Sequence, residues 1–141
     1  MPVYIEAGTG YGFAINNDDL TSEIMVDVFT KSRMFTMSPE IVRLKEDVGY
    51  DDIIDSHRKD LTRLGITISF IGDFYEGTGR ALAFTLSSTM SIQRHYGFMP
   101  LDISLGDESH SIENLLRLYE LFQEQGVNAP EPSWMSWITK S

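Results

Sequence analysis

Three aspartates in the middle of the chain have the spacing of a metal-binding motif. Asp51, Asp52 and Asp55 follow the pattern DDxxD, which places carboxylates one helical turn apart, where Mg²⁺ can bind between them. A small metal-dependent enzyme would use Asp51 and Asp55 as ligands. Acidic residues are also common in the first turn of a helix, because they interact favourably with the helix dipole. The metal-dependent enzyme is therefore an alternative hypothesis, and we predict neither a metal nor another cofactor.

Two Gly-Thr-Gly tripeptides are candidates for ligand binding. Gly8-Thr9-Gly10 and Gly77-Thr78-Gly79 each lie between stretches with alternating apolar residues. Glycine-rich loops bind phosphate when they lead into a helix, but neither tripeptide precedes a predicted helix, so two β-hairpin turns are the favoured interpretation. The alternative is a protein that sequesters a small ligand such as a nucleotide at the interface of a homodimer, with four ligand-binding glycines: Gly8, Gly10, Gly77 and Gly79.

Aromatic and acidic residues near the C-terminus are candidates for binding a protein partner. The C-terminal tail, residues 127–141, contains two prolines followed by Trp134 and Trp137, and tryptophan dominates the energetics of many protein interfaces. The segment 102–124 holds six acids and a single base, Arg117. We predict a partner-binding surface that combines both features and consists of Trp134, Trp137, Asp107, Glu108 and Glu113.

A sheet of β-hairpins would have to position these residues. Residues 66–86 alternate apolar and polar side chains around the second Gly-Thr-Gly, which is typical of a hairpin with one apolar face. A three-residue turn with Gly79 at positive φ would pair Phe70 with Leu86. The same rule, applied to the first Gly-Thr-Gly, predicts another hairpin over about 3–15.

Capping residues, proline and apolar spacing indicate helices between and after the hairpins. The four predicted helices cover residues 20–31, 39–49, 51–64 and 109–125. Residues 87–97 fit either a strand or a short helix, and residues 98–105 fit a strand interrupted by Pro100. The predicted fold class is α+β: an antiparallel sheet built from at least two β-hairpins (about 3–15 and 66–86), with three or four helices packed mainly on one face.

The composition indicates a soluble, cytoplasmic protein. With 141 residues, 42% of them hydrophobic, the chain can bury one core, so we expect a single domain over 1–141. The chain contains no cysteine, which excludes disulfides and thiolate catalysis and fits a reducing compartment. No apolar run of about 18 residues occurs, so we expect no membrane association through a spanning segment.

The net charge of -10 narrows the class of partner. Such a charge repels nucleic-acid phosphate and anionic membranes, and it attracts a basic protein. Since no catalytic constellation is recognisable, our main hypothesis is a non-catalytic acidic protein that occupies the surface of a basic, nucleic-acid-handling enzyme and inhibits it. A phage anti-defence protein or a bacterial immunity protein would be its concrete form.

Overall fold

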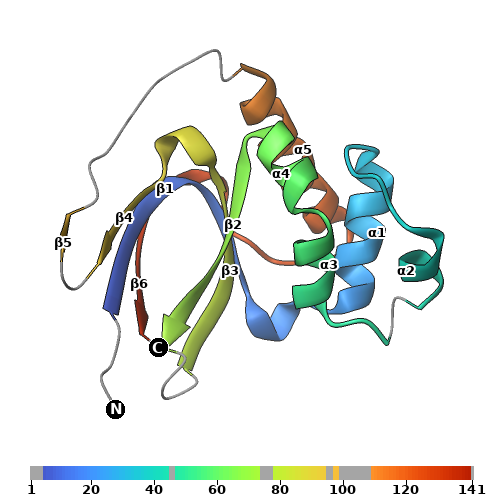
Figure 1. Cartoon of the computed structure of the whole chain (residues 1–141), viewed down its shortest axis with the longest axis horizontal. Helices are drawn as coiled ribbons and strands as arrows, with labels where there is room; N and C mark the ends of the chain where they lie inside the picture. Colours follow the sequence, from blue (N-terminus) through green and yellow to red (C-terminus); the bar gives the residue numbers. More distant parts are fainter. Residues whose placement is uncertain (1–4, 45–46, 74–77, 95–96, 99–108, 141) are drawn as a thin grey trace.

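The structure is a computed structural model that describes residues 5–44, 47–73, 78–94, 97–98 and 109–140. Within these residues the chain forms a six-stranded sheet in the order β3-β2-β6-β1-β4-β5, with helices gathered on one side of it (Figure 1). The strands are β1 (Ile5–Asn16), β2 (Ile66–Asp73), β3 (Thr78–Leu86), β4 (Ser91–Arg94), β5 (Gly97–Phe98) and β6 (Ser133–Lys140). The α-helices are α1 (Ser22–Ser32), α2 (Pro39–Arg43), α3 (Tyr50–Ser56), α4 (Arg58–Leu64) and α5 (Ser109–Glu124). Short 3-10 helices, η1 (Asn17–Asp19) and η2 (Ser87–Thr89), follow β1 and β3.

The predicted α+β class is confirmed, but the sheet is mixed rather than antiparallel. The ends of β2 and β6 run parallel, with Gly72 opposite Thr139 and Asp73 opposite Lys140. The other pairings are antiparallel: β1 pairs with β3, β4 and β6, and β2 with β3. Strands β1, β3, β2 and β6 therefore form a closed circuit of pairings, and the sheet must curl strongly to make it.

The predicted hairpin over 3–15 is wrong in the part that the structure describes, because residues 5–16 form the single strand β1. Its glycines Gly8, Gly10 and Gly12 lie on one face at alternate positions. A Cβ atom at Gly8 would lie 2.6 Å from Cζ2 of Trp137, and one at Gly12 would lie 2.9 Å from the Cα of Thr85. The glycines thus permit close approach across the curled sheet rather than a turn.

The hairpin over 66–86 is present as β2 and β3, but its predicted register is wrong. Phe70 lies opposite Leu82, not Leu86, and the pairing is irregular between Ile71 and Asp73. The cause is the position of the turn: Thr78 already pairs with Asp73 at the start of β3, so residues 74–77 connect the strands instead of the predicted turn over 77–79. The positive φ predicted for Gly79 is confirmed at 62°. The predicted pair of Glu76 and Arg80 falls partly in residues 74–77, outside the described residues.

Local sequence signals explain several helix ends, but the helix predicted over 39–49 is present only as α2 and ends at Arg43. The hydroxyl of Thr21 accepts a hydrogen bond from the backbone N–H of Ile24 (3.2 Å) and caps α1. The helix predicted over 51–64 is divided into α3 and α4 at His57, and Gly65 ends α4 with a φ of 75°. The predicted helix over 109–125 is confirmed as α5, which is followed by Gly126 at a φ of 82°.

In the segment after β3, the described residues 87–94 and 97–98 form η2 and strands rather than an α-helix. After η2, strand β4 pairs with the start of β1, and the two residues of β5 pair with β4. The choice left open for 87–97 is therefore resolved as η2 followed by strand. Of the strand predicted over 98–105, only Phe98 lies within the described residues.

Aromatic rings form the centre of the core between the sheet and the helices. Phe13 of β1 stacks on Phe84 of β3, with ring centroids 5.0 Å apart, and Phe122 of α5 lies 5.3 Å from Phe84. Phe84 is fully buried, whereas Phe70, which was expected to share its burial, is 36% exposed. Along this face of β2 the exposure therefore rises from Ile66 and Ile68, which are buried, to Phe70.

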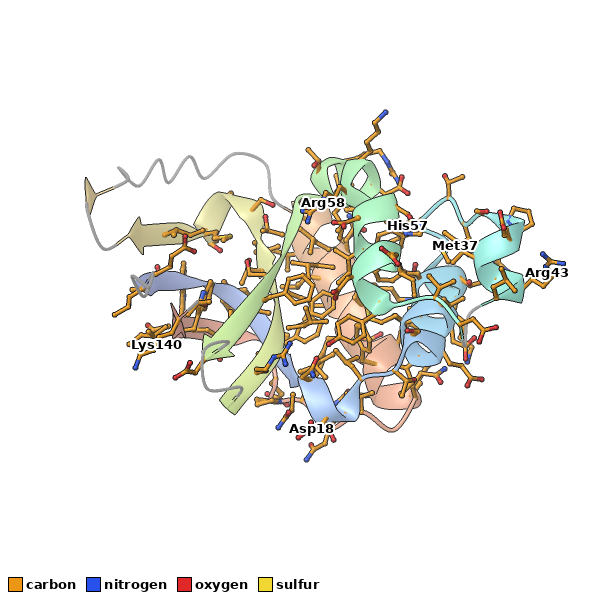
Figure 2. The ribbon with its side chains drawn as sticks, turned by 60° about the horizontal axis from the view of Figure 1, so that its bottom comes forward. Asp18, Met37, Arg43, His57, Arg58 and Lys140 are labelled. Carbon is orange, nitrogen blue, oxygen red and sulfur yellow. The ribbon has the colours of Figure 1, made fainter. Side chains whose placement is uncertain are left out.

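His57 is a core residue at the junction of α3 and α4 (Figure 2). Its side chain is 2% exposed, and its Nδ1 lies 2.6 Å from the carbonyl oxygen of Ile53. A carbonyl oxygen only accepts hydrogen bonds, so the hydrogen bond requires an N–H group at Nδ1 as its donor. The ring also packs edge-on against Phe29 and Phe35, and a structural role accounts for it fully.

Candidate functional site

An exposed apolar surface lies on the part of the sheet that the described helices leave uncovered. We call it the Trp134 face and define it by Ile5 and Tyr11 on β1 and Trp134 and Ile138 on β6. Trp134 is 68% exposed and Ile138 is 61% exposed. Tyr11 lies opposite Trp134 in the sheet, and their rings meet edge to face with centroids 5.8 Å apart. Large apolar side chains exposed side by side are typical of an interaction surface.

The alternation of β1 explains why this surface is apolar. Residues of odd number share one face of the strand, and on this face Phe13 and Ile15 are buried beneath the helices. The same face continues toward Ile5, where the strand extends away from the helices (Figure 1). Lys140 lies opposite Ile5 in the sheet. In Figure 2 it lies on the opposite side of the molecule from Arg43 of α2. The Trp134 face thus continues the core-facing side of the sheet beyond the region that the helices cover.

The two tryptophans, predicted to act as a pair, lie on opposite faces of β6. Trp137 lies opposite Gly8, and its indole ring occupies the space that a side chain at Gly8 would need. It is half-buried and fills the inside of the curled sheet, whereas Trp134 points outward. No strand was predicted over 133–140, because the alternation of β6 is one of exposure and not of residue type: apolar side chains occur on both of its faces.

The predicted acidic part of the partner surface is only partly described. Asp107 and Glu108 lie outside the described residues. Glu113 lies on α5, where its carboxylate is 76% exposed and 3.9 Å from Nδ1 of His110. Glu113 therefore belongs to a different element from the Trp134 face, which lies on β1 and β6.

Of the four predicted ligand-binding glycines, the structure describes Gly8, Gly10 and Gly79. Gly8 is covered by Trp137, and a Cβ atom at Gly10 would lie 3.1 Å from Cγ2 of Thr85, so packing accounts for both without a ligand. Gly77 lies outside the described residues. Gly79 is exposed and lines a cavity of about 190 Å³.

The three aspartates of the DDxxD pattern lie on α3. Asp51 and Asp52 are exposed in its first turn, and the Asp55 carboxylate accepts a hydrogen bond from Nε of Arg58 (2.9 Å). Within the described part of the chain, no group of three or more histidine, aspartate or glutamate side chains is arranged to hold a metal ion.

A larger cavity, of about 570 Å³, lies where α3 approaches the β2–β3 pair. Its lining residues come from five separate elements or their flanks: Asn17, Ser22, Gly49, Tyr50, Asp51, Phe70, Arg80 and Ala81. The rings of Tyr50 and Phe70 are within 22° of parallel, with centroids 6.4 Å apart. The Tyr50 hydroxyl donates a hydrogen bond to Oδ1 of Asn17. We call this space the Tyr50 cavity.

The charges around Tyr50 act in opposite directions. Burial raises the pKa of the Tyr50 phenol above its ordinary value, the Asp51 carboxylate raises it further, and the Arg80 guanidinium opposes both. The phenol therefore stays protonated at neutral pH and acts as a hydrogen-bond donor. This cavity could not be predicted from the sequence, because its residues lie far apart in the chain and form no local motif.

Comparisons with protein-family models, with curated proteins and with solved structures give no match. None of the helices in the described ranges is both long enough and apolar enough to cross a membrane. The function must therefore be argued from the Trp134 face and the Tyr50 cavity themselves.

Proposed function

We propose that this chain is a non-catalytic binding protein that docks a basic protein partner on its Trp134 face. The observation that carries the proposal is the exposure of Trp134 (68%) and Ile138 (61%) on one surface of β6. Interfaces are centred on buried aromatic anchors surrounded by less important contacts. Trp134, supported edge-on by Tyr11, is placed to be such an anchor.

Charge favours a basic partner. The chain carries -10 at pH 7, so its field accelerates encounter with a positively charged surface and slows encounter with phosphate. Enzymes that act on nucleic acids present such surfaces. Occupation of one of them would inhibit the enzyme, as expected of a phage anti-defence or immunity-type protein.

The strand geometry favours a protein over a small ligand at this position. The Trp134 face extends along two paired strands from Tyr11 to Ile5, a distance of roughly 20 Å at about 3.3 Å per residue. An extended apolar surface of this kind matches another protein surface, whereas small molecules bind in concave pockets. The alternative function, binding of a small ligand, is favoured by the Tyr50 cavity and not by the Trp134 face.

Kinetics would test the proposal once a partner captured from host cells has been identified and purified. Trp134→Ala should speed dissociation by roughly 30-fold, equivalent to about 2 kcal/mol for an interface anchor. Raising the salt concentration should slow association and leave dissociation nearly unchanged. Surface plasmon resonance measures both rates.

Two control variants make this experiment specific. Leu116→Ala removes another exposed apolar side chain, on α5, and should leave both rates unchanged. Trp137→Ala should lower the stability of the fold, because its ring fills the space over Gly8. A Trp134→Ala variant that dissociates at the wild-type rate, with its fold intact by circular dichroism, would refute the proposed surface.

A further inference from the structure

The Tyr50 cavity is a built recess, separate from the Trp134 face. We propose that it binds a planar aromatic anion of about the size of a mononucleotide, with the aromatic ring against Tyr50 and Phe70 and the anionic group at Arg80. This inference does not depend on the proposed protein partner.

The size of the cavity is appropriate for such a ligand. Its volume of about 570 Å³ lies within the roughly 300 to 1,000 Å³ typical of small-molecule sites. The cavity of about 190 Å³ that Gly79 lines shares Asn17 and Arg80 with it. A ligand with a flat ring in the larger space could therefore extend a polar group past Arg80 into the smaller one.

Tyr50 and Phe70 provide the aromatic wall. Their rings are close to parallel (22°), and both line the cavity. Phe70 is 36% exposed, although its cross-strand neighbour Leu82 is fully buried. Flat heterocycles stack on such rings, and stacking tolerates different bases because every base has a π-face.

The charged groups define where each end of the ligand would lie. Arg80 lines both cavities, and guanidinium groups bind phosphate and carboxylate with paired hydrogen bonds. Asp51 lines the larger cavity and Asp18 the smaller one. Since carboxylates accept hydrogen bonds, Asp51 favours a ring that carries amino groups, as adenine and cytosine do. Asn17, between the two spaces, offers an amide that can donate and accept.

Nuclear magnetic resonance would test the assignment on the full chain without any substitution. ¹⁵N-labelled protein is titrated separately with AMP, CMP, adenosine, inorganic phosphate and indole-3-acetate. We expect a mononucleotide or the aryl carboxylate to shift the amide signals of Gly49, Tyr50 and Arg80 and to leave those of Trp134 and Ile138 unchanged. Adenosine lacks the anionic group and phosphate lacks the aromatic ring, so each should bind at least about tenfold more weakly. A charge-assisted hydrogen bond and a stacked base are each worth about this factor or more.

The arms of the titration identify the source of the anion. A preference for AMP or CMP assigns a nucleotide, and a preference for indole-3-acetate assigns an aryl carboxylate; both support the site. The proposal is overturned if no compound shifts these signals at millimolar concentration. It is also overturned if phosphate alone binds as tightly as the aromatic anions, because the aromatic wall would then have no role.

Two variants separate the two halves of the site. Arg80→Gln should reduce the affinity for AMP to that for adenosine, its neutral analogue. Phe70→Leu, which keeps an apolar side chain, should weaken the binding of AMP and of adenosine by a similar factor of about ten. Arg58→Gln is the matched control, because Arg58 is exposed and pairs with Asp55 outside the cavity. Unchanged affinity in both Arg80→Gln and Phe70→Leu would refute the assignment even if binding itself were observed.

Discussion

Gly12→Ala should destabilise the protein by roughly 3 kcal/mol or more, because the new methyl group has no space and a well-packed sheet cannot move aside. A Cβ atom at Gly12 would collide with the carbonyl oxygen of Phe84 and lie 2.8 Å from its carbonyl carbon. Both are backbone atoms in the buried part of β3 (82–86), so no side chain can rotate to relieve the collision. Chemical denaturation, followed by circular dichroism, measures the loss.

Gly49→Ala is the matched control for this substitution. Gly49 has a φ of -67°, which alanine adopts readily, and the nearest atom to an added Cβ would be Oδ2 of Asp52 at 3.8 Å. Its cost should be at most about 1 kcal/mol, the usual loss at a helix N-cap. Equal stability of the Gly12→Ala and wild-type proteins would show that β1 does not cross β3 as closely as described.

Phe84→Ala should cost roughly 3 to 5 kcal/mol, whereas Phe70→Ala should cost less than about 1.5 kcal/mol. Phe84 is fully buried between Phe13 and Phe122, and its removal leaves a cavity in the core. Phe70 is 36% exposed at the Tyr50 cavity. Thermal and urea unfolding of both variants measure the difference. Equal losses would mean that both rings are buried, as the simple alternation of the sequence predicts.

The sequence predicted those elements whose patterns are local and unambiguous. Helices α1 and α5 have apolar residues at helical spacing, and both are confirmed; Gly126 marks the end of α5, whereas the cap of α1 is Thr21 and not one of the polar residues 16–19. The pairing of β2 with β3 follows from alternation around a turn. Its predicted register is wrong because the turn was expected over 77–79, whereas Thr78 and Gly79 belong to β3 and Thr78 already pairs with Asp73.

The errors arose where one residue type serves two physical purposes. Glycine permits both a turn and a close approach of two backbones; the spacing of Gly8, Gly10 and Gly12 is compatible with either, and only Trp137 and β3, brought near by the fold, decide between them. Strand β6 was missed because Pro130 and Pro132 precede it and tryptophans occupy both of its faces.

The candidate sites were predictable to very different degrees. Trp134 was identified from its residue type, and the structure places it on an exposed surface, although it separates Trp134 from Trp137. The Tyr50 cavity could not be predicted, since it joins Asn17, Tyr50 and Arg80 only after the sheet and helices have packed.

The central claim is that a basic protein docks on the Trp134 face, and site-specific photo-cross-linking tests it most directly. A photoreactive benzoyl-phenylalanine is placed at position 134 or, as a control, at the exposed position 116 on α5, and each protein is irradiated in extract from its host. We expect a basic protein to be cross-linked from position 134 and not from position 116, with a yield that falls as salt is added. An acidic partner, or equal cross-linking from positions 134 and 116, would contradict this claim. A yield of cross-linked product that does not change with salt would also contradict it.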